Sequence, residues 1–381
     1  MTRFLFYSHD SYGLGHFRRS SLLAAGVVGA DPDNEVLIVT GSPRAQAFRQ
    51  PDRVDTIKLP TATKNERGGY QPRKLASGID ALVRMRSAVI CAAATSYEPD
   101  VVVVDHSPTG MAGELRPLLD RYGVAGSRRP RLVLGLRDII DDAPTVQSAW
   151  TRNGIWDYVD RYDQIAVYGD DQILTTADEL GLGSRGSAEV IHTGYLAPTM
   201  PDAIGSESYL LVTAGGGGDG HALMRAYLSA VEAGAVSGLR SIVVTGPLMT
   251  AGRRAELLVR CEALASVEVL DFATNMRSLI ASAAGVISMG GYNTVVEELA
   301  AGVPTLLIPR RTPRLEQTIR AQRIAPHSDI AWAPVEELTP ARVAQFAHQC
   351  VHHPRARTTL NLRGLESAVD LLVSEGARAH V

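Results

Sequence analysis

One continuous stretch constrains the fold more than any other part of this 381-residue chain: residues 285–317, which read GVISMGGYNTVVEELAAGVPTLLIPRRTPRLEQ. A short apolar run over residues 285–288 predicts a buried strand, which a pair of glycines follows. A helix is expected to begin near Tyr292 and to end near Ala301, before the sequence Gly-Val-Pro. A second buried strand is expected over residues 305–308. Because a helix joins the two strands, they should be parallel neighbours, and the stretch predicts a βαβ unit.

The glycine turn of this unit is suited to bind a diphosphate. Gly290 and Gly291 allow a ligand to approach the backbone closely. The free N–H groups at the start of the helix would face that ligand, with the positive end of the helix dipole behind them, so no metal is required. Glu297 lies one turn along, on the same face as Asn293, where its carboxylate can accept hydrogen bonds from both hydroxyls of a ribose.

The segment after the second strand carries polar and basic side chains. Ligands of open α/β sheets bind at the carboxyl ends of the strands, so Glu316 and Gln317 could reach the hydroxyls of a sugar. Arg310, Arg311 and Arg314 precede them, and they could neutralise phosphate charge or form a solvated surface. An Arg-rich segment also leaves open an anionic sugar or acceptor.

These residues resemble the donor-site signature of GT-B glycosyltransferases. The matching pattern is Ser288-x-Gly-Gly-x-Asn-Thr-Val-x-Glu297, then Ala-Gly-x-Pro304 and Pro309-x6-Glu316-Gln317. The nearest resemblance is to family 28, which includes the enzyme that adds N-acetylglucosamine to the lipid precursor of peptidoglycan. The plant-type UDP-glycosyltransferases share the layout.

The resemblance implies a set of donor-binding residues in the second half of the chain. Within the signature they are Ser288, Gly290, Gly291, Asn293, Thr294, Glu297, Glu316 and Gln317. The glycines at 215–217 (Gly215, Gly216 and Gly217) are expected to flank the donor diphosphate, and the backbone of Ala273 is expected to read the uracil edge.

The whole chain alternates strand and helix signals, which favours an α/β fold. We expect the GT-B architecture, two doubly wound Rossmann-like domains facing a central cleft. Residues 1–197 should form the acceptor-binding domain and residues 198–381 the nucleotide-sugar-binding domain, with Pro198 and Pro201 marking the linker. In GT-B proteins the final helix, expected here over residues 355–375, often crosses back to the first domain.

The remaining elements follow from local patterns. Strands are expected over residues 4–8, 36–40, 100–105, 131–136, 164–167, 189–192, 209–213, 241–245 and 267–270. Helices are expected over residues 17–28, 75–95, 138–156 and 221–233. Residues 61–74 are polar and basic and contain glycine, and they are expected to form a mobile loop.

The first half offers candidates for acid–base chemistry. His16 ends a glycine loop at the start of a helix, where the helix N-terminus lowers its pKa and keeps it neutral, as a base must be. The loop Gly13-Leu-Gly15-His16 resembles the acceptor-side loop of these transferases, in which histidine often serves as the base. In plant-type enzymes an aspartate in the place of Asp105 orients that histidine, so Asp105 is expected to pair with His16. His106 is a rival base, and Arg137 is a further acceptor-site candidate.

Each candidate also has a plain structural explanation. His16 could cap its helix or only bind acceptor, and Asp105 and His106 could belong to an ordinary loop. Thr294 and Glu297 fit a capping box, while Glu298 is expected to be solvated. The sequence GGGGDG at residues 215–220 also matches a dinucleotide motif, but the following strand lacks the acidic residue that such a site needs.

Composition narrows the function classes. The net charge is −3, which indicates no nucleic-acid partner, and no apolar run is long enough to span a membrane. The N-terminus leads directly into a strand and the three cysteines are scattered, so a cytoplasmic protein without structural zinc is expected. The helix over residues 75–95 combines apolar residues with arginines and leaves open a peripheral membrane contact.

We therefore predict a metal-independent, inverting glycosyltransferase with a UDP-sugar donor, no cofactor and a small-molecule, lipid-linked or polysaccharide acceptor. A nucleotide-sugar hydrolase or 2-epimerase on the same fold, or a non-catalytic nucleotide-sugar-binding protein, are the alternatives. The acceptor and the oligomeric state do not follow from the sequence.

Overall fold

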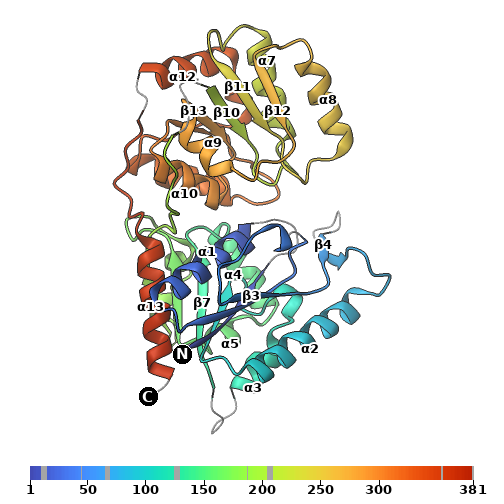
Figure 1. Ribbon diagram of the computed structural model, residues 1–381, viewed down its shortest axis with the longest axis vertical. Helices are drawn as coiled ribbons and strands as arrows, with labels where there is room; N and C mark the ends of the chain where they lie inside the picture. Colours follow the sequence, from blue (N-terminus) through green and yellow to red (C-terminus); the bar gives the residue numbers. More distant parts are fainter. Residues whose placement is uncertain are drawn as a thin grey trace. The chain divides into compact units, whose positions relative to one another are not determined.

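The computed structural model describes residues 1–9, 15–43, 45–64, 69–123, 129–186, 188–203, 209–352 and 355–379. The chain forms two compact units (Figure 1). The first contains Met1–Leu196 and Arg363–Val381, and the second contains Ala197–Leu362. The last helix, α13 (Gly364–Ala379), is thus part of the first unit. The chain passes from the first unit to the second after Leu196, one residue before the predicted boundary.

A seven-stranded parallel sheet forms the centre of the first unit. Its strand order is β3-β2-β1-β6-β7-β8-β9. The strands are β1 (Arg3–Ser8), β2 (Glu35–Thr40), β3 (Val54–Lys58), β6 (Val101–Asp105), β7 (Arg131–Arg137), β8 (Gln164–Tyr168) and β9 (Glu189–His192). Every residue of β6 is buried, as expected for a β-branched strand that helices cover on both faces.

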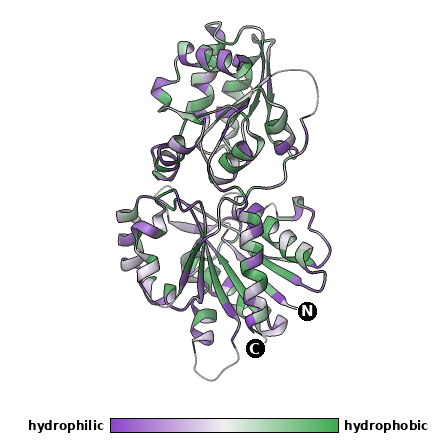
Figure 2. Cartoon of the chain, turned by 90° about the vertical axis from the view of Figure 1, so that its left-hand side faces the viewer, coloured by the Kyte–Doolittle hydropathy of each residue, from purple (hydrophilic) through white to green (hydrophobic). Residues whose placement is uncertain are grey.

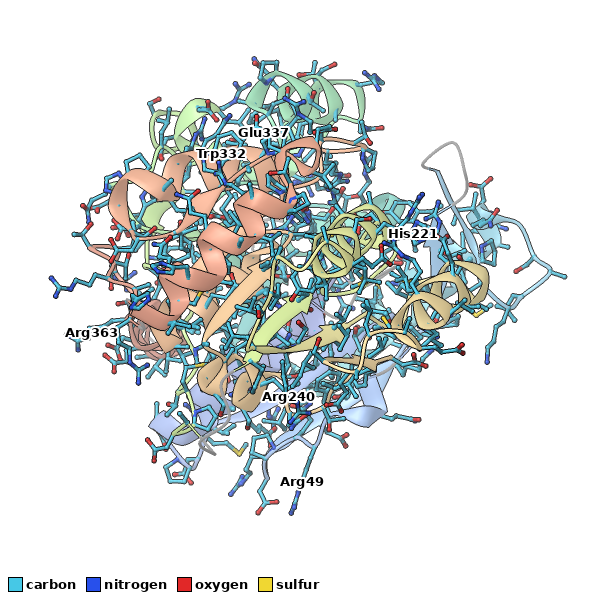
Figure 3. All side chains as sticks on the ribbon, turned by 90° about the horizontal axis from the view of Figure 1, so that it is seen from above. Arg49, His221, Arg240, Trp332, Glu337 and Arg363 are labelled. Carbon is cyan, nitrogen blue, oxygen red and sulfur yellow. The ribbon has the colours of Figure 1, made fainter. Side chains whose placement is uncertain are left out.

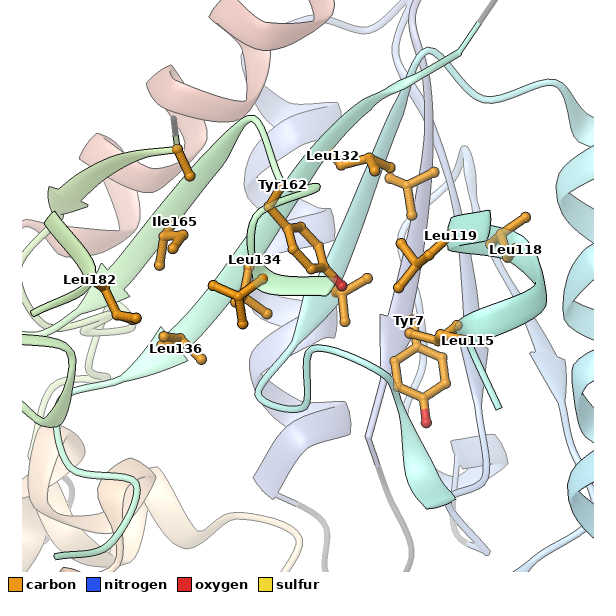
Figure 4. Close-up of a cluster of buried hydrophobic side chains, with 14 of the residues drawn as sticks. Tyr7, Leu115, Leu118, Leu119, Leu132, Leu134, Leu136, Tyr162, Ile165 and Leu182 are labelled. Atoms are coloured by element: carbon orange, nitrogen blue, oxygen red, sulfur yellow. The ribbon is translucent and has the colours of Figure 1, made fainter. Parts of the chain in front are cut away.

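Helices and a packed apolar core surround this sheet. The helices of the first unit, besides α13, are α1 (Gly15–Ala30), α2 (Ile79–Tyr97), α3 (Arg116–Tyr122), α4 (Ala143–Arg152), α5 (Trp156–Val159) and α6 (Thr176–Glu179). Figure 4 shows one part of the core, in which Leu134 of β7 lies beside Tyr162, and Leu132 and Leu136 of the same strand belong to the same cluster. The hydropathy colouring shows the same distribution, because the strands of this sheet are mostly hydrophobic (Figure 2).

The helix α13 is fixed to the first unit by packing and by a buried carboxylate. Just before it, the side chain of Arg363 projects away from the ribbon (Figure 3). The helix packs on α1, where Gly26 leaves room for Val369. Glu375 is fully buried and accepts hydrogen bonds from Arg131 Nε and Arg378 Nη1, both at 2.6 Å. Two arginines therefore compensate a charge that would otherwise be costly to bury.

The second unit has a six-stranded parallel sheet in the order β12-β11-β10-β13-β14-β15. Its strands are β10 (Tyr209–Thr213), β11 (Arg240–Val244), β12 (Val267–Leu270), β13 (Gly285–Ser288), β14 (Thr305–Leu307) and β15 (Ala331–Trp332). Its helices are α7 (His221–Glu232), α8 (Ala251–Cys261), α9 (Met276–Ser282), α10 (Tyr292–Ala301), α11 (Glu316–Ile324) and α12 (Pro340–His352). Strand order 3-2-1-4-5-6 is the doubly wound Rossmann order, so the predicted fold class is confirmed.

Some local predictions were wrong. Residues 61–74, expected as a mobile loop, contain the antiparallel hairpin β4 (Ala62–Lys64) and β5 (Tyr70–Pro72). The helix expected over residues 355–375 begins only at Gly364, because the preceding described residues pair with other loops, as in the bridges Leu196–Arg363 and Ser328–Thr358. Within the described ranges, no helix is both long and apolar enough to cross a bilayer.

Candidate functional sites

Both units place their candidate residues at the same topological position. In the first unit the strand order reverses between β1 and β6, and in the second it reverses between β10 and β13. Such a switch point, at the carboxyl ends of the strands, is where open α/β sheets bind ligands. His16 follows β1 and Asp105 ends β6, whereas Gly215 follows β10 and Gly290 follows β13. Each unit therefore has one candidate site.

The first site is a histidine paired with a buried aspartate. His16 Nδ1 lies 2.6 Å from Asp105 Oδ2, as the sequence predicted for this pair. We assign the proton to Nδ1 from this short distance, which leaves Nε2 with the lone pair that a general base uses. The side chain of His16 is 20 % exposed, whereas that of Asp105 is almost fully buried. The pair therefore combines an accessible base with a protected partner.

Sequence reasoning missed Arg19, which completes this arrangement. Arg19 donates to Asp105 Oδ1 through Nε (2.8 Å) and Nη2 (2.6 Å), and Nη2 also lies 2.9 Å from Oδ2. Arg19 is three residues after His16 in α1, so helical spacing places both on one face, and this was the signal available in the sequence. The bidentate contact fixes the carboxylate toward the imidazole.

Burial is the main reason why the pKa of His16 is lowered. Burial lowers the pKa of His16, and the charges of Arg19 and Arg137 lower it further, although Asp105 opposes them. For Asp105, burial acts to raise the pKa, but Arg19 and His16 outweigh it and hold the pKa at about 2. At neutral pH the site thus has an ionised carboxylate, an arginine and an uncharged imidazole.

Two further histidines lie beside His16. The ring centroids of His16 and His106 are 4.9 Å apart, and those of His16 and His9 are 5.6 Å apart. His106 has a positive φ of 70°, an uncommon conformation for a residue other than glycine, at the turn that follows β6. His9 Nε2 lies 3.2 Å from the hydroxyl of Tyr70 in the hairpin. The rival base His106 therefore lies next to His16.

The other acceptor-site candidates are placed as follows. Gly15 is the first residue of α1, Arg137 is the last residue of β7, and Gly13 lies outside the described residues. The influence of Arg137 on His16 places its charge near the base.

The second site is built from two glycine segments. Gly215 and Gly217 have positive φ values, and a Cβ on Gly217 would come 2.0 Å from the carbonyl oxygen of Thr245, so only glycine fits there. Gly216 accepts a hydrogen bond from the N–H of Leu248 at 2.9 Å. A Cβ on Gly215 would lie 4.0 Å from Thr294 Oγ1, so the loop after β10 adjoins the first turn of α10.

The start of α10 has the features of an anion site. Its N-cap is Gly291, which offers no side chain to cap the helix, so ligand atoms can approach the first N–H groups. Thr294 is the third helical residue rather than the N-cap, so the capping-box explanation for Thr294 and Glu297 is wrong. Gly290 has a φ of 78°, and its carbonyl accepts from Nη1 of the fully buried Arg320 at 3.1 Å.

The donor-site side chains surround this helix start. Glu297 is buried on α10, with Oε1 3.8 Å from Nε of Arg277, and Asn293 is half-buried one turn before it. Glu316 and Gln317 begin α11 and are both buried. Ser288 is buried at the end of β13.

The residues after β12 differ in exposure. Ala273 is partly buried and packs with Met276 on an apolar cluster, whereas the side chain of Phe272 lies outside that cluster and is 37 % exposed. Among the described residues, no three His, Cys, Asp or Glu side chains are grouped to hold a metal ion.

The expectation for Glu298 was wrong. It was expected to be solvated, but it is 0 % exposed, because it faces the sheet from the buried side of α10. Burial raises its pKa to about 8; the nearby hydroxyl of Ser288 acts against this rise, and the charge of Glu297 adds to it. Within the described ranges, neither carboxylate oxygen meets a hydrogen-bond partner of good geometry.

Comparisons with known proteins agree with this architecture. Residues 228–371 match the model of the glycosyltransferase family 28 C-terminal domain, and no curated protein matches the chain. The solved glycotransferase of kitacinnamycin is similar with a TM-score of 0.61 at 16% identity, over 98% of this chain and 99% of that chain.

Two further solved structures are similar over nearly the whole chain. UGT2 from Phytolacca americana, complexed with UDP-2fluoro-glucose and pterostilbene, has a TM-score of 0.60 at 13% identity, over 100% of this chain and 95% of that one. A putative UDP-N-acetylglucosamine 2-epimerase from Listeria monocytogenes has a TM-score of 0.59 at 12% identity, over 99% and 94%. The chain thus has the GT-B fold, and its residues 228–371 match the C-terminal domain of glycosyltransferase family 28, in agreement with the resemblance and the enzyme class expected from the sequence.

Proposed function

We propose that this glycosyltransferase is a metal-independent, inverting enzyme that takes its sugar from a UDP-sugar. The second unit binds the donor, with the diphosphate against the glycine segments at Gly215 and Gly290 and the ribose hydroxyls on Glu297. Backbone N–H groups and the dipole of α10 stabilise the charge that develops on the leaving diphosphate. The UDP-sugar ligand of the Phytolacca americana protein and the name of the Listeria protein support a uridine donor.

The observation that carries the chemical step is the pair of His16 and Asp105. As the acceptor oxygen attacks the anomeric carbon, its proton moves to His16 Nε2, and the bond from that carbon to the diphosphate oxygen breaks. UDP leaves with the bonding electrons, and the anomeric configuration inverts. Asp105 stabilises the imidazolium that forms, and Arg19 keeps the carboxylate ionised and oriented.

The first experiment is a thermal-shift screen of nucleoside diphosphates and nucleotide sugars, followed by a transfer assay with the best donor. We expect UDP and one UDP-sugar to raise the melting temperature. Glu297→Ala should weaken UDP binding by about tenfold or more, because two hydrogen bonds to a charged group are lost. Glu336→Ala, which removes an exposed glutamate of the same unit, is the matched control. An unchanged affinity in Glu297→Ala would remove the ribose role.

A second candidate function is suggested by the likeness to the putative 2-epimerase. A 2-epimerase would form an epimer of the donor sugar without any acceptor, and a hydrolase would release the free sugar. Product analysis of the donor alone distinguishes both from transfer. UDP binding without turnover against a broad acceptor panel would indicate a nucleotide-sugar-binding protein.

A further inference from the structure

One arginine in the second unit connects the two segments that are expected to hold the diphosphate and the sugar. Arg310 follows β14, and its Nη1 pairs with Asp219, which lies in the glycine loop after β10. Its Nη2 donates to Glu316 Oε1 at 2.8 Å. Its side chain is 23 % exposed and that of Glu316 only 9 %. We call Asp219, Arg310 and Glu316 the Arg310 clamp.

The backbone of Arg310 adds two contacts to the same helix start. Its N–H donates to Gln317 Oε1 at 3.1 Å, and its carbonyl accepts from Thr318 Oγ1 at 3.1 Å. Because the amide oxygen of Gln317 accepts this bond, its NH₂ group is the end left to face a ligand. Gln317 is thus oriented by backbone, whereas Glu316 is oriented by the side chain of Arg310.

The charge balance of the clamp argues against a direct phosphate role for this arginine. One guanidinium serves two carboxylates, so the clamp carries a net charge of about −1 and offers no surplus cation to a diphosphate. The fork geometry of a guanidinium fixes a carboxylate more rigidly than an ammonium would. The glycine loop does not depend on the clamp alone, since Gly216 is also held by the N–H of Leu248.

We propose that Arg310 is a positioning residue for the donor sugar, which holds Glu316 in the orientation that accepts sugar hydroxyls and so determines which UDP-sugars bind. This inference rests on the proposed function, because it takes a nucleotide sugar as the ligand of the second unit. A site that orients hydrogen-bonding groups rejects a substrate whose hydroxyls point elsewhere, since buried groups are then left unpaired. The clamp would make Glu316 such a group.

The test compares the affinities of UDP, UDP-glucose, UDP-galactose and UDP-N-acetylglucosamine by calorimetry. The variants are Arg310→Gln, Arg310→Lys and the control Arg311→Gln, which changes an exposed neighbour. We expect Arg310→Gln to leave the Kd for UDP within about twofold of the parent protein but to weaken the preferred UDP-sugar by about tenfold, which corresponds to one lost hydrogen bond to a charged group. Arg310→Lys should be intermediate, and it replaces Arg310→Gln if that variant does not fold.

A double-mutant cycle shows whether Arg310 acts through Glu316. In the Glu316→Ala background, Arg310→Gln should have no further effect on the affinity for the preferred UDP-sugar. Additive losses, an equal loss of affinity for UDP itself, or behaviour identical to Arg311→Gln would overturn the inference. The inference would also be overturned if the parent protein bound UDP-sugars no more tightly than UDP. If the parent protein binds UDP, these outcomes leave the proposed function standing; if it binds no uridine nucleotide, the proposed function fails first.

Discussion

Replacing His16 with alanine should lower turnover by about 10²–10⁴-fold, the usual contribution of a positioned general base. The affinity for the UDP-sugar should change little, because His16 belongs to the first unit and the donor site to the second. Steady-state kinetics with the donor and acceptor identified by the screen, together with calorimetry of the donor, measure both quantities. His348→Ala, which removes an exposed histidine of α12, is the control for histidine loss in general.

The pH profile gives an independent test of the same residue. A base must be neutral to accept a proton, so kcat/KM should rise with pH through the pKa of His16 and then level off. Because burial lowers that pKa, the midpoint should lie below 6.5, the usual value for histidine. Asp105→Asn should reduce turnover as well, since the imidazolium loses its partner. Near-normal turnover in His16→Ala would contradict this account and transfer the role to His106 or to the substrate.

Replacing Glu298 with glutamine should change the pH dependence of stability. The pKa of this buried carboxyl is raised from 4.5 to about 8, so between these values the folded protein holds a proton that the unfolded chain has lost. Rising pH therefore destabilises the parent protein by about 1.4 kcal/mol per unit across this window. Glutamine cannot ionise, so the variant does not lose stability in this way. The difference in unfolding free energy between Glu298→Gln and the parent protein should therefore shift in favour of the variant by on the order of 4 kcal/mol from pH 4.5 to pH 8.

Urea unfolding from pH 4.5 to pH 8 measures this difference. Glu336→Gln is the control, because its side chain is exposed and should not alter the slope. Parallel stability curves for the parent protein and Glu298→Gln would show that the carboxyl is ionised in the folded state, contrary to its burial.

The parts of the fold that follow from local sequence were predictable. The strands Gly285–Ser288 and Tyr209–Thr213 and the helix Tyr292–Ala301 have the predicted bounds, because apolar runs, a glycine turn and a terminating Gly-Val-Pro define them locally. The hairpin of β4 and β5 was missed because its residues are polar and derive their order from pairing with each other.

The candidate sites likewise contain some residues that could be predicted from the sequence and others that could not. His16 and Asp105 were paired from the sequence through their places at strand and helix ends and through a family resemblance. Arg19 was missed because its spacing from His16 shows only that the two share a helix face, and not that the arginine side chain contacts Asp105, 86 positions away. Glu298 was misjudged because a charged residue beside a predicted ligand contact is usually solvated, and only the packing of α10 against the sheet shows that it is buried.

Arg310 could not be assigned from the sequence either. As one of three arginines in a short segment, it fitted a phosphate contact or a plain surface equally well. Its role depends on Asp219, which is 91 residues away in the chain and reaches it only because β10 and β13 are neighbours and β14 follows in the same sheet. Long-range pairing of this kind is set by topology rather than by local pattern.

The central claim is that a uridine diphosphate binds where β13 meets α10, with its phosphates on the N–H groups that follow Gly291. The direct measurement is the electron density of crystals soaked with UDP, supported by loss of that density in Glu297→Ala crystals. The account predicts pyrophosphate density at the first turn of α10 and beside Gly215, with the ribose on Glu297. An empty helix start in crystals that bind UDP elsewhere would contradict it.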